Sequence, residues 1–267
     1  MIIIGEKINS SIPSARVMIE ARDQQALINL AKAQQDAGAA FIDINAGMFL
    51  DKEGEVLTFL AEMLKDVIDV PLSVDTPSAA VVAVVLKAIG AAGHHHLINS
   101  ITAQPERLDV MSSLAAEYGC GVVALCMQAS KMPENTESRL KIADILIETL
   151  TKKGIKQSDI YIDPMLRPLG ADDTAGTDAI DAIRCLRATY PECHIVVGLS
   201  NLSFGLPSRR IINRAFAVAA MTAGLDAAIS DPLDRDLMGL IAATNIILGQ
   251  DEFCMEYLGK FRSGKIG

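Results

Sequence analysis

The sequence from residue 194 to residue 210, HIVVGLSNLSFGLPSRR, decides the predicted fold. Its first half is a short apolar run without helical periodicity, which predicts a strand buried on both faces. The chain then turns through a Gly/Pro segment, and an Ala-rich helix begins at about Arg209. Strands of this kind deliver functional residues at their carboxyl ends in α/β proteins. Asn201 is therefore the leading candidate for a functional residue, although an isolated Asn here also suits a turn.

The same succession of apolar strand, polar end and helix recurs along the chain. We expect strands at residues 2–5, 41–45, 71–75, 96–99, 121–127, 160–163, 194–198 and 225–229. We expect helices at residues 22–38, 53–67, 77–89, 105–118, 136–153, 177–189, 209–223 and 235–248. Eight such units predict a (β/α)8 TIM barrel, in one domain over residues 1–267 with a short tail after about residue 249. A doubly wound open sheet is the alternative, but there is no Gly-rich dinucleotide or nucleotide loop.

Composition narrows the class of protein. The chain has 267 residues, is 50% hydrophobic and carries a net charge of −9. A phosphate backbone selects clustered Lys and Arg, so we expect no nucleic-acid partner. We also expect no membrane span, because charged or Gly residues interrupt every apolar run. Five cysteines without CxxC spacing and no export signal indicate a cytoplasmic protein with reduced thiols.

Acid and amide side chains gather at the predicted strand ends. The set comprises Glu6, Asn9, Asn45, Asp75, Asn99, Asp163, Asn201 and Asp231. In a barrel these ends meet at one mouth, so the side chains would line one pocket. Any single member could instead cap a helix or stabilise a turn, yet caps would include Ser and Thr as often. The excess of Asp and Asn predicts a polar pocket that donates and accepts hydrogen bonds and binds no metal.

Two other kinds of site are disfavoured. His94, His95 and His96 are adjacent, and successive side chains of a strand point to opposite faces, so they cannot share one metal ion. They also lie at the entrance of the strand, opposite the predicted mouth, and we expect partly packed surface histidines. Cys126 could lie near the mouth, but no His falls near a strand's carboxyl end to activate a nucleophile.

Six segments together resemble one family, the pterin-binding methyltransferases. The segments are Gly5-Glu6-Lys7-Ile8-Asn9, Asp43-Ile44-Asn45-Ala46-Gly47, Ser73-Val74-Asp75-Thr76, Leu97-Ile98-Asn99-Ser100, Tyr161-Ile162-Asp163-Pro164 and residues 198–207. The family includes methyltetrahydrofolate:corrinoid protein methyltransferases and the folate module of cobalamin-dependent methionine synthase. The likeness extends in order from the first residues to about Leu248. Dihydropteroate synthase is a more distant relative, and the turn after Pro164 lacks its Gly-rich pattern.

The resemblance implies roles for the strand-end residues. It implies that Asp75, Asn99 and Asp163 hydrogen-bond the pterin ring, and that Asn201 is catalytic beside N5. It places Arg209 near the p-aminobenzoate or glutamate part of folate, although an exposed arginine of the first helical turn is an equal alternative. Further pocket residues would be Glu6, Asn9, Asp43, Asn45 and Ser200, with Asp43 supporting its neighbours from mid-strand.

The resemblance also implies substrates and partners. Tetrahydrofolate or methyltetrahydrofolate would be the substrate, and a corrinoid (cobalamin) would arrive on a separate protein, since the chain has no Asp-x-His-x-x-Gly signature. A homodimer without a bound metal is expected. The direction of methyl transfer stays open, as do a dihydropteroate synthase-like condensing enzyme and a non-catalytic folate-binding module.

Overall fold

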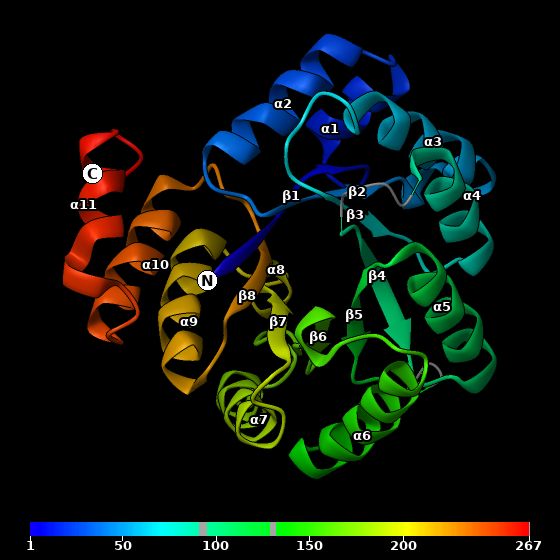
Figure 1. The fold of residues 1–267 in the computed structure, drawn as a ribbon. Helices are drawn as coiled ribbons and strands as arrows, with labels where there is room; N and C mark the ends of the chain where they lie inside the picture. The colour runs from blue at the N-terminus through cyan, green and yellow to red at the C-terminus, as the bar shows by residue number, and fades with distance from the viewer. Residues whose placement is uncertain (91–94, 129–131, 267) are drawn as a thin grey trace.

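The computed structural model describes residues 1–90, 95–128 and 132–266. Within these residues, eight parallel strands close into a barrel in the order β1 to β8 (Figure 1). The strands are β1 (Ile2–Asn9), β2 (Phe41–Asn45), β3 (Leu72–Asp75), β4 (Leu97–Thr102), β5 (Gly121–Leu125), β6 (Ile160–Asp163), β7 (His194–Gly198) and β8 (Ala227–Ser230). The predicted TIM barrel in a single domain is confirmed.

Helices surround the barrel. They are α1 (Pro13–Glu20), α2 (Gln24–Asp36), α3 (Glu53–Leu64), α4 (Ala79–Ile89), α5 (Pro105–Tyr118), α6 (Thr136–Lys152), α7 (Ala175–Thr189), α8 (Leu199–Leu202), α9 (Arg209–Ala223), α10 (Arg235–Ile247) and α11 (Met255–Arg262). Short 3-10 segments are η1 (Gly47–Lys52), η2 (Gln157–Asp159) and η3 (Glu252–Cys254). The predicted helix start at Arg209 is confirmed.

Apolar side chains fill the barrel toward the amino ends of its strands. Ile4, Leu97, Val123, Tyr161, Val196 and Ala227 form one buried cluster inside it. The alternate residues of the same strands, such as Ile3, Ile98 and Ile195, are buried among the surrounding helices. Because successive side chains point to opposite faces, both faces of each strand are apolar, as the sequence indicated. This filling leaves the carboxyl ends of the strands as the place for a ligand.

Two strands are longer than the sequence predicted. β1 continues past Gly5 to Asn9, with a register shift between Gly5 and Ile8 against β2. β4 continues past Asn99 to Thr102, with a shift between Asn99 and Ile101 against β5. Glu6, predicted to stand just past a strand, and Asn99, predicted as the last residue of a strand, therefore both lie within strands, and these two predicted strand ends were wrong. Irregularities of this kind bend a strand and redirect its side chains, and they are frequent beside active sites.

Two short helices near the strand ends were not predicted. α1 begins at Pro13, a residue favoured in the first turn of a helix. α8 follows β7 directly and contains Asn201, in a stretch that the sequence indicated as a loop.

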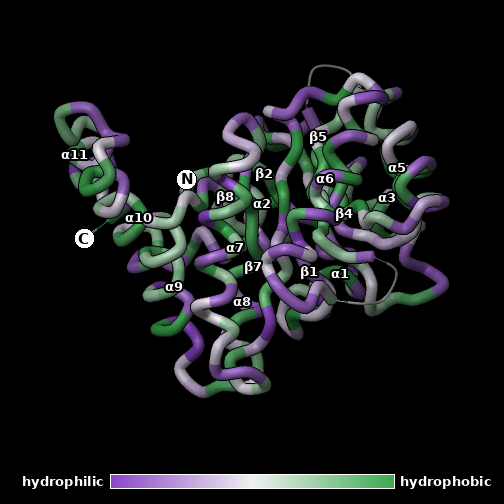
Figure 2. Tube along the Cα trace, turned by 90° about the horizontal axis from the view of Figure 1, so that it is seen from below, coloured by the Kyte–Doolittle hydropathy of each residue, from purple (hydrophilic) through white to green (hydrophobic). Residues whose placement is uncertain are grey.

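The C-terminal residues, expected to be a short tail, form η3 and α11. Asp251 anchors this segment, because its carboxylate accepts hydrogen bonds from the amides of Glu256 and Tyr257, both at 2.9 Å. α11 lies beside α10 and stands outside the ring of helices (Figures 1 and 2). We call residues 249–266 the C-terminal arm.

Of the two described histidines before β4, His95 is exposed, as expected, whereas His96 is not. His96 is only 4% exposed, and its Nδ1 accepts a hydrogen bond of 3.1 Å from the Leu72 amide, so it is a buried residue that joins β3 to the start of β4. His95 lies 3.2 Å from the Gly119 carbonyl oxygen, and His94 falls outside the described residues. In the part of the chain that the structure describes, no three His, Cys, Asp or Glu side chains form a metal-binding group. Nor is any described helix long and apolar enough to cross a membrane.

Candidate active site

A cavity of about 830 Å³ opens at the carboxyl ends of the strands. Nearly all the predicted site residues line it: Glu6, Asn9, Asp43, Asp75, Asn99, Asp163, Ser200, Asn201 and Arg209. They come from six of the strands or from the segments that follow them. The volume is within the range of small-molecule sites.

Asp75 is held in place by a residue that lies behind it. The Asn45 amide donates a hydrogen bond of 2.9 Å to Asp75 Oδ2, and the Ser10 hydroxyl donates one of 3.0 Å to Asn45 Oδ1. Because its carboxamide is turned toward these two partners, Asn45 is not among the residues that line the cavity. Asn45 was predicted to be a pocket residue; instead it supports Asp75 from behind.

Asp43 connects three neighbouring strands. Its Oδ1 accepts a hydrogen bond of 2.6 Å from the Ser73 hydroxyl and one of 3.2 Å from the Asn99 amide. All three side chains are buried. The bond to Asp43 fixes the orientation of the Asn99 carboxamide, so its oxygen remains free to accept a hydrogen bond within the cavity.

The turn after β6 fixes Asp163. The Met165 amide donates a hydrogen bond of 2.7 Å to Asp163 Oδ1. Met165 has φ of 67°, a left-handed conformation that is unfavourable for a side chain of this size and turns its amide back toward the carboxylate. Beneath this turn, buried Arg139 donates from Nε to the Pro164 carbonyl oxygen at 2.7 Å.

The segment after β7 presents Asn201. Gly198 lies so close to Asn201 that a Cβ atom at residue 198 would stand 2.9 Å from the Asn201 Nδ2. Arg209 braces the segment, since its Nη2 donates to the Ser200 carbonyl oxygen at 2.6 Å and its Nε to the Ser203 hydroxyl at 3.1 Å. Arg209 is exposed and borders the cavity, which is compatible with both interpretations of this residue.

Burial makes the carboxylates of the cavity hard to ionise. Desolvation, helped by the nearby Asp231, raises the pKa of Glu6 to about 7. Desolvation also raises the pKa of Asp75 and that of Asp163 to about 6. The pKa of Asp43 is raised by its full burial and then by the charge of Asp75. Near neutral pH these groups can therefore exchange protons with a ligand.

Asp231 does not line the main cavity. Its carboxylate pairs with Lys7 Nζ at 3.1 Å and borders a smaller neighbouring cavity of about 200 Å³. Lys7 was not predicted from the sequence, although it belongs to the segment 5–9. The sequence does not show which way the Lys7 side chain points, and nothing else about this residue indicated a role. Sequence reasoning also missed other residues of the lining, namely Ser11, Ile12, Pro13, Ser100, Leu125, Met165, Gly198, Phe204 and Ile229.

The barrel and its cavity define a class of protein, and comparison with known proteins identifies that class. Residues 8–231 match the family described as pterin binding enzyme, so the chain belongs to this family. Over 269 residues, the chain is 34% identical to the methylcorrinoid:tetrahydrofolate methyltransferase of Eubacterium limosum, covering 100% of this chain and 98% of the relative.

Other relatives are more distant. Over 243 residues the chain is 30% identical to the methionine synthase of Mycobacterium tuberculosis. The matched region covers 86% of this chain but only 20% of that much longer protein. Among solved structures, a Yersinia pestis dihydropteroate synthase superposes with a TM-score of 0.64 at 25% identity, covering 93% of this chain and 91% of the other. That structure is a relative in fold.

Proposed function

We propose that this protein is a methyltransferase that moves a methyl group between a corrinoid, carried by a separate protein, and N5 of tetrahydrofolate. One observation carries the proposal. Asp75, Asn99, Asp163 and Asn201, from four different strand ends or strands, surround a single cavity in a chain that matches a methyltransferase along its whole length. The edge of a pterin ring alternates hydrogen-bond donors and acceptors, and this mixture of carboxylates and carboxamides can serve both.

Asp75, Asn99 and Asp163 would bind and orient the pterin ring. Their own hydrogen bonds to Asn45, Asp43 and the Met165 amide hold the side chains in place before the ligand arrives. Such preorganisation lets binding energy position N5 for in-line transfer. Arg209, at the rim, would contact the p-aminobenzoate or glutamate part of folate.

Asn201 would stabilise charge at N5. When N5 of tetrahydrofolate attacks the methyl carbon, a nitrogen–carbon bond forms and the nitrogen becomes positively charged. The Asn201 carboxamide oxygen can accept a hydrogen bond from the N5 proton as that charge develops. Glu6, with a pKa of about 7, is suited to take the proton afterwards. The methylated corrinoid supplies the methyl group, and cobalt keeps the electron pair as its bond to carbon breaks.

We propose transfer from the methylcorrinoid to tetrahydrofolate as the working direction. The support is the name of the Eubacterium limosum relative, which gives the methylcorrinoid as donor. The reverse transfer passes through the same transition state, so the site serves both directions and the reactant concentrations decide the net flow.

An anaerobic spectroscopic assay tests the function. Purified protein is mixed with methylcobalamin and tetrahydrofolate, and the appearance of cob(I)alamin is followed against a reaction without protein. We expect protein-dependent demethylation of the cobalamin and an equal amount of methyltetrahydrofolate. Binding of tetrahydrofolate without this exchange would instead indicate a folate-binding module, and condensation of a pterin pyrophosphate with p-aminobenzoate would indicate a dihydropteroate synthase.

The proposal includes a homodimer in the cytoplasm. The resemblance to the family supports the homodimer. The five cysteines are all free in the structure, which accords with a reducing compartment.

A further inference from the structure

Glu6 faces two cavities. It lines the active-site cavity, and it also lines the smaller cavity of about 200 Å³. Ser200 and Arg209 line both cavities as well, so these three side chains stand between the two spaces. The smaller cavity lies between the first turns of α9 and α10, where Arg210 and Leu237 line it. A proton that Glu6 accepts from a ligand in the first cavity can therefore be released into the second.

An irregularity of β1 gives Glu6 and its neighbour Lys7 their positions. Successive side chains of a regular strand point to opposite faces, yet both residues line the active-site cavity. The register shift of β1 against β2 explains this, because a bulge sets two residues of one strand against one residue of its neighbour. Buried Gln34 of α2 holds the irregularity, since its Oε1 accepts a hydrogen bond of 3.0 Å from the Lys7 amide. Lys7 Nζ then reaches Asp231, beside the smaller cavity, at 3.1 Å.

The smaller cavity is polar and suited to water. Ser230 lines it and is only 2% exposed, and among the residues that the structure describes its hydroxyl has no hydrogen-bond partner. A buried hydroxyl of this kind needs a water molecule as its partner, and the cavity has room for several at about 30 Å³ each. The side chain of Asp231 is 22% exposed, and Arg210 is exposed too. The cavity therefore links Glu6 with solvent.

Asp231 is the carboxylate of this cavity that can accept a proton from water. Its Oδ1 accepts a hydrogen bond of 3.0 Å from the Leu233 amide, and its Oδ2 pairs with Lys7 Nζ. A carboxylate has several acceptor positions, so Asp231 can bind water in addition. Asp234 also lines the cavity, but its carboxylate accepts a hydrogen bond of 2.6 Å from Arg214 Nη2 and caps α10.

Charged groups of both signs surround Glu6. Lys7 follows it in β1 and Arg209 begins α9, and these two cations favour the carboxylate form of Glu6. Asp231, after β8, favours the acid form, and Asp43 of β2 and Glu6 repel each other when both are ionised. Because the opposing charges act together, Glu6 can hold a proton and then release it.

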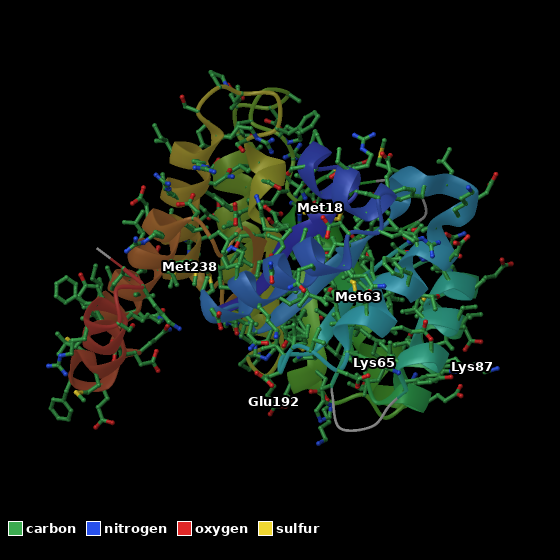
Figure 3. All side chains as sticks on the ribbon, turned by 90° about the horizontal axis from the view of Figure 1, so that it is seen from above. Met18, Met63, Lys65, Lys87, Glu192 and Met238 are labelled. Atoms are coloured by element: carbon green, nitrogen blue, oxygen red, sulfur yellow. The ribbon has the colours of Figure 1, made fainter. Side chains whose placement is uncertain are left out.

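The mouth of the barrel is a poor exit for a proton during methyl transfer. Figure 3 shows the barrel from its side, with Met18 of α1 toward the mouth and Glu192, which precedes β7, at the opposite end. The pterin and the corrinoid must meet at the mouth, so they cover it. One proton nevertheless leaves for each methyl group that passes from the methylcorrinoid to tetrahydrofolate, because N5 exchanges a bond to hydrogen for a bond to carbon.

We propose that the smaller cavity is the proton exit of the active site. The N5 proton passes to a carboxylate oxygen of Glu6, then to water in the smaller cavity and, with Asp231 as the next acceptor, to solvent between α9 and α10. Each step breaks one bond to hydrogen and forms another, and no group is oxidised or reduced. Lys7 positions Asp231, and Ser230 binds the water. The inference rests on the proposed function; in the reverse transfer, the same route supplies the proton.

Stopped-flow measurement of proton release tests the exit. Protein, methylcobalamin and tetrahydrofolate are mixed anaerobically in weak buffer, cob(I)alamin is followed by its absorbance and the released proton by an indicator dye. In the native protein the two should appear together. In Asp231→Asn the proton should appear about tenfold or more slowly than cob(I)alamin, and added imidazole, a small base, should remove the lag. Asp236→Asn, which alters a 73% exposed acid on α10, is the matched control and should behave as the native protein does.

Ser230→Val gives a second test. It replaces the hydroxyl with apolar groups, so it should cause the same lag without changing the affinity for tetrahydrofolate, measured by calorimetry. Circular dichroism checks that both variants are folded. Proton release that keeps pace with cob(I)alamin in Asp231→Asn would overturn the exit and leave the proposed function standing. No methyl transfer by the native protein would instead overturn the proposed function, and the exit with it.

Discussion

At the scale of single residues, Asn201 should matter more to the reaction than to binding. Asn201→Ala removes the oxygen that accepts the N5 proton but leaves Asp75, Asn99 and Asp163 to hold the ring. We expect kcat to fall about 100-fold, the loss typical of one preorganised hydrogen-bonding group. Tetrahydrofolate binding, measured by calorimetry, should change little. An unaltered kcat would remove Asn201 from the reaction.

Asp75, in contrast to Asn201, should matter more to tetrahydrofolate binding than to the rate of the reaction. The Asp75 carboxylate accepts a hydrogen bond from the Asn45 side-chain amide. It also lines the cavity, where it can accept further hydrogen bonds from a ligand. Asp75→Ala removes hydrogen bonds to the ring and also leaves the Asn45 amide without its carboxylate partner. We expect the Kd for tetrahydrofolate to rise about tenfold to 100-fold, as the loss of hydrogen bonds to a charged group predicts. Native-like affinity in a folded Asp75→Ala protein would contradict its role.

Glu6 should make the protein less stable as the pH rises. Burial raises the pKa of Glu6 from 4.5 to about 7, so the folded state holds this proton more tightly than the unfolded chain does. The stabilisation is fully present below pH 4.5 and is lost as the pH rises through 7.

Glu6→Gln removes this dependence. Between pH 5 and pH 8, the fall in the free energy of unfolding should be about 2–3 kcal/mol smaller in the variant, measured by urea denaturation. Asp75 and Asp163 also make the free energy of unfolding fall as the pH rises. Both residues are present in the two proteins, so their contributions cancel in the comparison. Identical pH profiles would show that Glu6 ionises normally.

At the scale of elements, the junction of β7 with α8 should depend on Gly198. A Cβ at this residue would stand 2.9 Å from Asn201 Nδ2, closer than such atoms approach in proteins. Gly198→Ala should therefore displace the Asn201 carboxamide and lower kcat about tenfold or more, because small misplacements of a reacting group are costly. Gly170→Ala is the matched control, since its Cβ would meet Leu206 Cδ2 at an ordinary 3.7 Å. Equal activity of the two variants would contradict this view of the junction.

The elements also show where the sequence was sufficient. Short apolar runs located all eight strands, because a strand buried on both faces has a local signature. The strands' ends were less accurate at Glu6 and Asn99, because pairing with β2 and β5 continues across irregularities that no local pattern indicates. α1 was missed because its eight residues follow the site segment without a polar capping residue.

At the scale of the whole molecule, folate should stabilise the barrel as one unit. The cavity draws side chains from strands around most of the circle, so a bound ligand opposes unfolding of all of them together. At a tetrahydrofolate concentration 100 times the Kd, linkage predicts about 2.7 kcal/mol of added stability. This corresponds to a rise of about 5–10 °C in Tm, measured by scanning calorimetry. The Asp75→Ala protein at the same tetrahydrofolate concentration should show a much smaller rise in Tm. Separate unfolding transitions for different parts of the chain would contradict stabilisation of the barrel as one unit.

The sequence by itself determined the barrel, the family and most of the acid and amide residues at the mouth. These depend on periodicity and on residue type, which are local properties. Only the tertiary structure decided which side chains face the cavity: Asn45 turns behind Asp75, Asp231 pairs with Lys7 outside it, and His96 is buried against β3. The same holds for the C-terminal arm, where Ile266 is buried while Phe253, Met255 and Phe261 are exposed. Direction and burial of a side chain depend on strand register and on neighbours distant in sequence, and those neighbours exist only once the chain has closed on itself.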